Sequence, residues 1–247
     1  MSNRETAQAT LGQVWELLGD IFKILGKKFS GLSLSQVQRL ISNKKQLIDS
    51  YWKVALDILG EVEDVHLNLV GEWQRFYSEV LRITVDLSTL VIPPKPEGNW
   101  WLIVVVPGVT YNQIINMMRK LFQVWVWTDN LDKAVDMAKE QRQATDKPYA
   151  IWVRANVEAD SDNSNKSAND LVNTPQITLM ERLLLESVYF MRTGEHLDVT
   201  NVTLCAGSRG LVGRVPGVDW RGSGGELYIR YFDSGHSCDD LRSRSVS

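Results

Sequence analysis

The sequence predicts an α+β fold with an α/β-like core, in which an N-terminal helical region precedes a mixed sheet of about five or six strands with flanking helices. Short apolar runs at residues 101–106, 124–128 and 149–154 predict buried strands, and amphipathic segments separate them. A proline-rich stretch at residues 93–98 divides these runs from earlier helical patterns. Because apolar runs that alternate with helical patterns are typical of βαβαβ units, we expect the three strands to share one buried sheet.

The helical region, residues 1–92, is predicted from apolar residues at three- and four-residue spacing. The first stripe begins at Leu11, and Ser33 with Gln36 fits a capping box that starts a further helix. Through these helices we expect contact with another protein. The two short helices at 33–59 also have the spacing of a helix-turn-helix, but a three-helix packing unit is the favoured interpretation, because no basic recognition helix stands out.

The last helix of this region is predicted from about Val65 to Ile83. It carries an apolar stripe from Trp73 to Leu81, which must bury against something, so we expect it to pack on the sheet. Residues 93–98 contain three of the seven prolines and predict a stiff linker. An α/β domain then spans 99–235, and a polar tail, 236–247, is expected to be solvated.

Capping residues predict where helices begin in the α/β domain. Thr110 and Asp129 can each cap a helix after one of the first two strands. Thr178 and Glu181 fit a second capping box. The helix that follows is apolar on most sides and is expected to lie centrally against the sheet, with Gly194 as its C-cap. Glycine-rich breaks between the later β-prone runs predict a closing antiparallel meander or hairpin.

Composition and charge argue against several classes of protein. The net charge of −3 predicts no strong general attraction to nucleic acid or to an anionic membrane. Net charge does not describe how charges are distributed, so binding of nucleic acid through a local basic patch remains an open question. Nine tryptophans are best explained as core residues. The first ten residues show no signal-peptide pattern, and no apolar run approaches the roughly 20 residues that span a bilayer. We therefore expect a cytoplasmic protein that has no membrane partner.

Metal and cofactor sites are not expected. The polar segment 158–170 is predicted to be a surface loop, and its acids lack the glycine and distal glutamate of a calcium-binding EF-hand. Cys205, His236 and Cys238 lack the paired spacings of zinc sites. Nucleotide-binding, serine-hydrolase and metalloprotease motifs are missing from the sequence. The expectation is no metal, no disulfide and no cofactor.

Two stretches supply the first ligand-binding candidates. Gly108 and Thr110 belong to the turn after the first strand, where backbone N–H groups at a helix start can hold an anion. His196 lies between Glu195 and Asp198, and an imidazole beside carboxylates can act as a general base. A plain turn is the favoured interpretation in both places. The first turn lacks a nucleotide-binding fingerprint, and sequence neighbours such as Glu195 and His196 often point apart.

Later loops supply the remaining ligand-binding candidates, Arg209, Asp219 and Trp220. Loops that carry an arginine, a carboxylate and an aromatic ring often bind ligands, although the same groups often satisfy one another in tight turns. No catalytic residue is assigned.

Three functions are compatible with these features. The preferred hypothesis is a non-enzymatic binding or interaction protein, because enzyme motifs are missing. The second is a nucleic-acid- or nucleotide-associated protein that uses tryptophans and arginines. The arginines concerned are Arg209, Arg214, Arg221, Arg242 and Arg244. The third is a hydrolase or transferase, which requires His196, Arg209 and Asp219 to converge in one cleft.

The order of several segments is similar to that of a known family. The resemblance rests on SLSQVQRLI, VDLSTLVIPPKPEG, YAIWVRANVEAD, ITLMERLLLE, GEHLDVTNVTLCAGSR, VPGVDW and LRSRSVS, and it extends from about Ser33 to the C-terminus. The family resembled is one of uncharacterised bacterial proteins from candidate phyla, known mostly from environmental genomes. The resemblance implies a bacterial, cytoplasmic protein that forms one recurrent unit. It implies no site residue, because the family has no assigned activity.

Overall fold

The computed structural model describes residue 27, residues 31–43 and residues 65–247. The chain forms two compact units, Met1–Val65 and His66–Ser247. The stripe that begins at Leu11 and the predicted helix at 47–59 lie outside the described residues, so the helix-turn-helix and three-helix alternatives stay predictions. The proline-rich segment 93–98 lies within the second unit, whose hydrophobic core includes residues from both sides of it.

Helix α2 (Leu34–Ser42) belongs to the first unit and begins as the sequence predicts. The Ser33 N–H donates to Gln36 Oε1 at 2.8 Å, and the Gln36 N–H donates to Ser33 Oγ at 3.4 Å. This reciprocal pair is a capping box, which satisfies two N–H groups that a helix start otherwise leaves unpaired.

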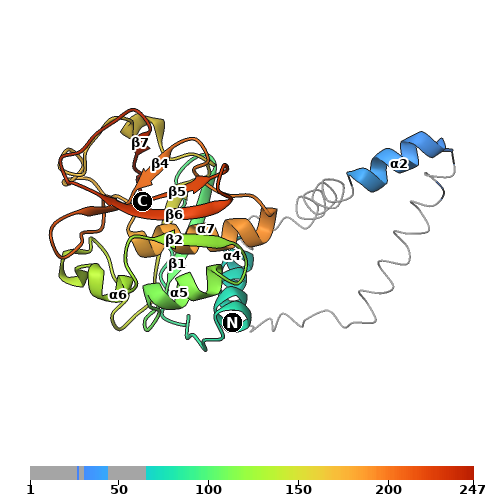
Figure 1. Ribbon diagram of the computed structural model, residues 1–247. Coiled ribbons are helices and arrows are strands. Elements are labelled where there is room, and N and C mark those ends of the chain that lie inside the picture. The colour runs from blue at the N-terminus through green and yellow to red at the C-terminus, as the bar shows by residue number, and fades with distance from the viewer. Residues whose placement is uncertain (1–26, 28–30, 44–64) are drawn as a thin grey trace, which may run out of the picture. The chain divides into compact units, whose positions relative to one another are not determined.

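The larger sheet of the second unit has five strands in the order β2-β6-β5-β4-β7 (Figure 1). The strands are β2 (Gln123–Val126), β4 (Val202–Leu204), β5 (Val215–Arg221), β6 (Glu226–Phe232) and β7 (Leu241–Arg242). The three central strands pair antiparallel, which confirms the predicted meander. The outer strands β2 and β7 pair parallel with β6 and β4, so the sheet is mixed as predicted.

The smaller sheet pairs β1 (Trp100–Val105) with β3 (Tyr149–Arg154) in antiparallel register. The expectation of one βαβαβ unit is therefore wrong, since β2 lies in the other sheet. The cause is physical: a continuous apolar run reports burial of a strand, and it carries no information about which strand is its partner.

Four helices belong to the described part of the second unit, and α7 is the one most deeply buried. They are α4 (Val65–Arg75), α5 (Tyr111–Met118), α6 (Leu131–Ala134) and α7 (Leu179–Thr193), with short π or 3₁₀ segments at Phe76–Val80, Met137–Lys139 and Ser161–Asn163. Helix α7 contacts both β1 and β5 (Figure 1), and its first nine residues are buried. Its predicted capping box and its left-handed Gly194 C-cap are confirmed.

Two other helix starts test the predicted caps. Thr110 caps α5 as expected, with Gln113 completing the capping box. The predicted cap at Asp129 is wrong, because Asn130 Oδ1 accepts the Lys133 N–H and starts α6 one residue later. Both side chains are good N-caps, so the pattern alone could not distinguish adjacent candidates.

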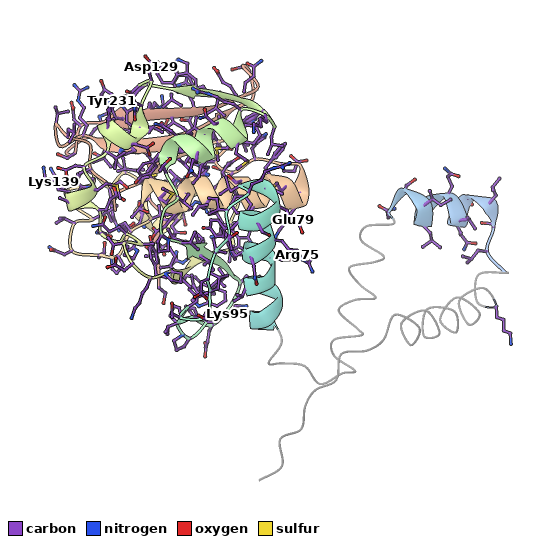
Figure 2. The ribbon with its side chains drawn as sticks, turned by 90° about the horizontal axis from the view of Figure 1, so that it is seen from below. Arg75, Glu79, Lys95, Asp129, Lys139 and Tyr231 are labelled. Atoms are coloured by element: carbon purple, nitrogen blue, oxygen red, sulfur yellow. The ribbon has the colours of Figure 1, made fainter. Side chains whose placement is uncertain are left out.

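Helix α4 packs on the smaller sheet, as the Trp73–Leu81 stripe predicts. The Trp73 indole donates to the Leu102 carbonyl at 3.0 Å, and the Tyr77 hydroxyl donates to the Val104 carbonyl at 2.6 Å. These side chains satisfy carbonyls on the edge of β1 that lacks a neighbouring strand. Arg75 and Glu79 are exposed along the same helical segment (Figure 2).

The C-terminal residues do not form a solvated tail. Leu241, Ser243 and Arg244 are buried, and Ser247 exchanges two backbone hydrogen bonds with Trp152 on β3. The expectation failed because polar side chains in a short segment are a poor guide to burial when their partners are distant in sequence.

Segment 158–170 is also less exposed than a plain surface loop. Asp160, Asn163 and Ala168 are buried, and the carboxylate of Glu158 accepts the N–H groups of residues 199–201 at 2.9–3.1 Å. Glu158 and Asp160 therefore serve as hydrogen-bond acceptors for other parts of the chain, whereas Asp162 is exposed and pairs with Arg154. The described residues contain no group of three or more His, Cys, Asp or Glu side chains that could hold a metal ion.

The two cysteines are free thiols. Cys205 is buried and Cys238 is half-buried. Among the described helices, none combines the length and the apolar character needed to cross a membrane.

Candidate functional site

The turn at Gly108 and Thr110 is occupied by the protein's own carboxylate. Asp132 Oδ1 accepts the Tyr111 N–H at 2.7 Å, and both oxygens of Asp132 lie 3.4 Å from the Asn112 N–H. A carboxylate is the natural partner of a helix N-terminus, where the unpaired N–H groups are partly positive. The N–H groups that an anionic ligand would need at this turn are therefore already engaged.

Four buried charged side chains form an ion network beneath the larger sheet. Arg182 Nη1 lies 2.7 Å from Glu186 Oε2, and Arg182 Nε lies 2.9 Å from Asp198 Oδ2. Arg244 Nη2 lies 2.8 Å from Asp198 Oδ1. All four residues are fully buried. Two arginines and two carboxylates neutralise each other here, which makes their burial tolerable.

His196 lies at the margin of this network. Its Nδ1 is 2.8 Å from Glu186 Oε1, and its ring stacks on Trp220 at 3.3 Å between centroids. Glu186 is thus the carboxylate that contacts the imidazole, in place of the sequence neighbours Glu195 and Asp198. The structure brings two predicted candidates together, His196 and Trp220, but as a packed contact with 11% of the His196 side chain exposed.

Arg209 and Asp219 lie with other partners. Arg209 donates to the carbonyls of Ala206 and Ser208, both at 2.8 Å. Asp219 lies 3.2 Å from Arg230 Nη2 and 3.5 Å from Arg221 Nε, while burial raises the pKa of its carboxyl above the ordinary value. No contact joins Arg209 or Asp219 to His196 in the described structure, so the geometry does not support the hydrolase or transferase hypothesis.

A buried carboxyl group lies beside the first turn of α7. Glu140 Oε2 accepts the Ser208 hydroxyl at 2.9 Å, and Ser208 Oγ in turn accepts the Leu179 N–H at 2.7 Å. Glu140 Oε1 is buried without a hydrogen-bond partner. Burial raises the pKa of Glu140 to about 8, so this side chain is largely neutral at pH 7 and acts as an internal packing group.

A row of stacked side chains crosses the opposite face of the larger sheet. The Trp125 and Tyr228 rings stack at 4.0 Å with an interplanar angle of 5°. The Arg221 guanidinium lies 3.5 Å from the centroid of the Tyr228 ring. Because β6 lies between β2 and β5, the two neighbours cover opposite sides of Tyr228. We call Trp125, Tyr228 and Arg221 the stacked row.

Strand register produces the stacked row. Trp125 is paired with Tyr228 across β2 and β6, and Arg221 is placed opposite Glu226 by the β5–β6 hairpin. The turn of that hairpin, Gly222–Gly225, contains a glycine in left-handed conformation at position 225, which suits glycine because it has no Cβ. Side chains two residues apart share a face, so Tyr228 and Arg230 project together.

The β2 end of the stacked row is open. Trp125 is 40% exposed, and within the described residues its ring contacts no aromatic ring other than Tyr228. The β4–β7 end of the same face is instead covered by Ala168 and Leu171, which pack with strand residues in a second hydrophobic cluster. The uncovered surface is thus limited to β2, β6 and the end of β5.

A cleft of about 430 Å³ borders Trp125. It is lined by Arg119, Lys120, Leu121, Phe122, Gln123, Val124, Trp125 and Glu226. The cleft is shallow and open to solvent, so a ligand bound here would lie on the surface of the sheet. Among the described residues, Arg119 and Lys120 have no ion pair with a carboxylate. The cleft therefore combines an aromatic wall with two available cations.

Sequence reasoning identified only part of this site. The run 124–128 was predicted to be a strand, and in the structure Trp125 is exposed while Val124 and Val126 pack against the core. Arg221 was among the arginines of the nucleic-acid hypothesis, but Tyr228, Arg119 and Lys120 were not singled out. Tyr228 could not be assigned, because its contact with Trp125 depends on a parallel pairing between strands about a hundred residues apart.

No family model, curated protein or solved structure matches this chain. The resemblance to a bacterial family stays a prediction, and any functional conclusion rests on the site itself.

Proposed function

We propose that the protein binds single-stranded nucleic acid on the stacked-row face of the larger sheet and catalyses no reaction on it. The observation that carries the proposal is the stacked row ending in the exposed ring of Trp125. Each base has a flat face, and stacking on an aromatic side chain contributes about 1–3 kcal/mol per base whatever its sequence. A base placed on Trp125 continues an existing stack.

Local charge supports the same proposal despite the net charge of −3. Four cations lie along the cleft and the stacked row: Arg119, Lys120, Arg221 and Arg230. They face two carboxylates, Asp219 and Glu226, so the surface has a local excess of two positive charges. Such an excess attracts phosphates and makes the affinity dependent on salt.

The non-enzymatic part of the proposal is supported by where the reactive groups lie. His196 is held between Glu186 and Trp220, and the buried carboxylates of the ion network are paired with arginines. The described clefts are lined by other residues. We keep the cytoplasm as the proposed compartment.

The test is fluorescence anisotropy with a labelled single-stranded DNA of about 12 nucleotides, within the usual site size of such proteins. We expect binding that weakens as salt rises, and a loss of about tenfold or more for Trp125→Ala. Trp125→Phe keeps a ring and should retain most of the affinity. Met191→Ala, at an exposed apolar residue on α7, is the control for nonspecific loss of apolar surface.

Two outcomes contradict the proposal. If no strand binds even at low salt, the protein does not have this function. If Trp125→Ala binds as tightly as the wild type while both remain folded by circular dichroism, the nucleic acid lies elsewhere. A duplex of the same sequence should bind more weakly, because its bases are already stacked on one another.

Helix α2 supports a second candidate function, binding of another protein. Leu34 and Ile41 are 83% and 56% exposed, and exposed apolar side chains on one helix are typical of interaction surfaces. The measurement is the mass of the protein in cell extract. A mass equal to the monomer, with no co-purifying protein, contradicts this candidate, and Ile41→Glu should reduce any complex that forms.

A further inference from the structure

The cleft beside Trp125 contains a carboxylate in a defined position. Glu226 begins β6 and is paired in register with Gln123, two residues before the Trp125–Tyr228 pair. Because side chains two residues apart on a strand share a face, Glu226 projects from the same face as Tyr228 and lies next to the stacked row. It lines the same cleft as Trp125, Arg119 and Lys120.

The hydrogen-bonding capacity of Glu226 is unused in the described structure. Across the hairpin, Arg221 contacts Asp219 and the Tyr228 ring. Glu226 is only partly buried, so its oxygens remain accessible from the cleft. An ionised carboxylate is an acceptor only, with no proton to donate.

We propose that this cleft holds one amino-bearing nucleobase, stacked on Trp125, with its exocyclic amino group donating to Glu226. This inference rests on the proposed function and specifies which base the site prefers. The phosphates on either side of the base lie against Arg119 and Lys120. Cytosine, adenine and guanine carry an amino group, whereas uracil and thymine present carbonyl oxygens to an acceptor. A carboxylate accepts from the cytosine amino group and repels a carbonyl.

Oligo(dC) and oligo(dU) of equal length give the sharpest comparison, because the two bases differ on one edge alone, where cytosine has an amino group beside an unprotonated ring nitrogen and uracil has a carbonyl beside a ring N–H. Anisotropy titrations at mildly alkaline pH, where cytosine is neutral, should show oligo(dC) binding about tenfold more tightly than oligo(dU). Glu226→Gln should reduce this ratio towards one, because a glutamine amide both donates and accepts. Glu195→Gln, at an exposed carboxylate after α7, should leave the ratio unchanged.

The outcomes separate the two proposals. Equal binding of both strands by the wild type, or an unchanged ratio in Glu226→Gln, overturns the base preference and leaves strand binding intact. Failure of both strands to bind overturns strand binding. Deoxycytidine monophosphate that competes as well as the strand, mole for mole, supports recognition of the base and overturns the single strand as the ligand.

Discussion

At the scale of single residues, Asp198 shows how the buried charges are held in place. Its backbone φ of 55° lies in the left-handed region, which aspartate tolerates better than most residues. The carboxylate accepts from Arg182, Arg244, Thr203 and the Ala159 N–H. These contacts compensate for the strain of the backbone, and the residue in turn links α7 to β4 and to the C-terminal segment.

Glu140 gives a prediction about pH. The pKa of its carboxyl is raised by burial from 4.5 to about 8. The folded protein therefore binds this proton more tightly than the unfolded chain, so the stabilising contribution is complete below the unfolded pKa and is lost as pH rises through about 8. Glu140→Gln is neutral at every pH, and its free energy of unfolding should decline less than that of the wild type between about pH 5 and 8.

Urea denaturation at a series of pH values measures this effect. Glu195→Gln replaces an exposed carboxylate and should follow the wild-type profile. If Glu140→Gln and the wild type decline in parallel, the Glu140 carboxyl does not have the raised pKa assigned to it.

At the scale of elements, the smaller sheet depends on side chains that replace missing strands. Tyr77→Phe removes the hydroxyl that donates to the Val104 carbonyl and leaves that carbonyl buried without its partner. The free energy of unfolding should fall by about 1–3 kcal/mol. Tyr231→Phe removes a hydroxyl at a partly exposed position, and it should change the free energy of unfolding by less than about 0.5 kcal/mol. If chemical denaturation shows that both substitutions lower the free energy of unfolding equally, the Val104 carbonyl on the edge of β1 does not require the Tyr77 hydroxyl as a partner.

Elements were predictable from the sequence where their causes are local. Ser33, Thr110, Thr178 and Gly194 were identified as caps because each acts on backbone groups within four residues. The pairing of β2 was missed because the strand reaches β6 across the chain. Sequence periodicity specifies which side of a strand is buried and leaves its neighbours open.

The candidate site was only partly predictable for the same reason. Alternation alone places Trp125 on the opposite face of β2 from Val124 and Val126, and the structure shows that the Trp125 face is the exposed one. The cleft, by contrast, combines Arg119 and Lys120 from the end of α5 with Glu226 from β6, and only the folded chain brings them together. Two adjacent cations after a helix are a common surface pattern, so Arg119 and Lys120 alone did not indicate a binding site.

At the scale of the whole molecule, residues 240–247 complete the second unit. They supply β7, the buried Arg244 and the hydrogen bonds between Ser247 and Trp152. A chain ending at Asp239 leaves Asp198 without Arg244 and exposes one edge of each sheet. We expect this truncation to prevent cooperative unfolding of residues 66–239, since removing one partner of a buried ion pair alone costs about 3–5 kcal/mol.

Thermal unfolding followed by near-ultraviolet circular dichroism tests this expectation. Removal of residues 2–26 provides a comparison, since they lie in the first compact unit and should leave the transition of the second unit in place. A truncated chain that retains a sharp transition would show that the C-terminal segment is dispensable.

The burial of Arg244 also has a consequence for biosynthesis. A ribosome releases the chain from its N-terminus onwards, and domains generally fold as their sequences emerge. The second unit cannot finish folding in that order. Asp198 lacks its partner Arg244, and the free edge of β3 lacks its partner Ser247, until residues 244–247 have been translated. A nascent chain that stalls before residue 244 presents an unpaired edge of β3 and an Asp198 that is not compensated by Arg244, and chaperones should recognise it as incompletely folded.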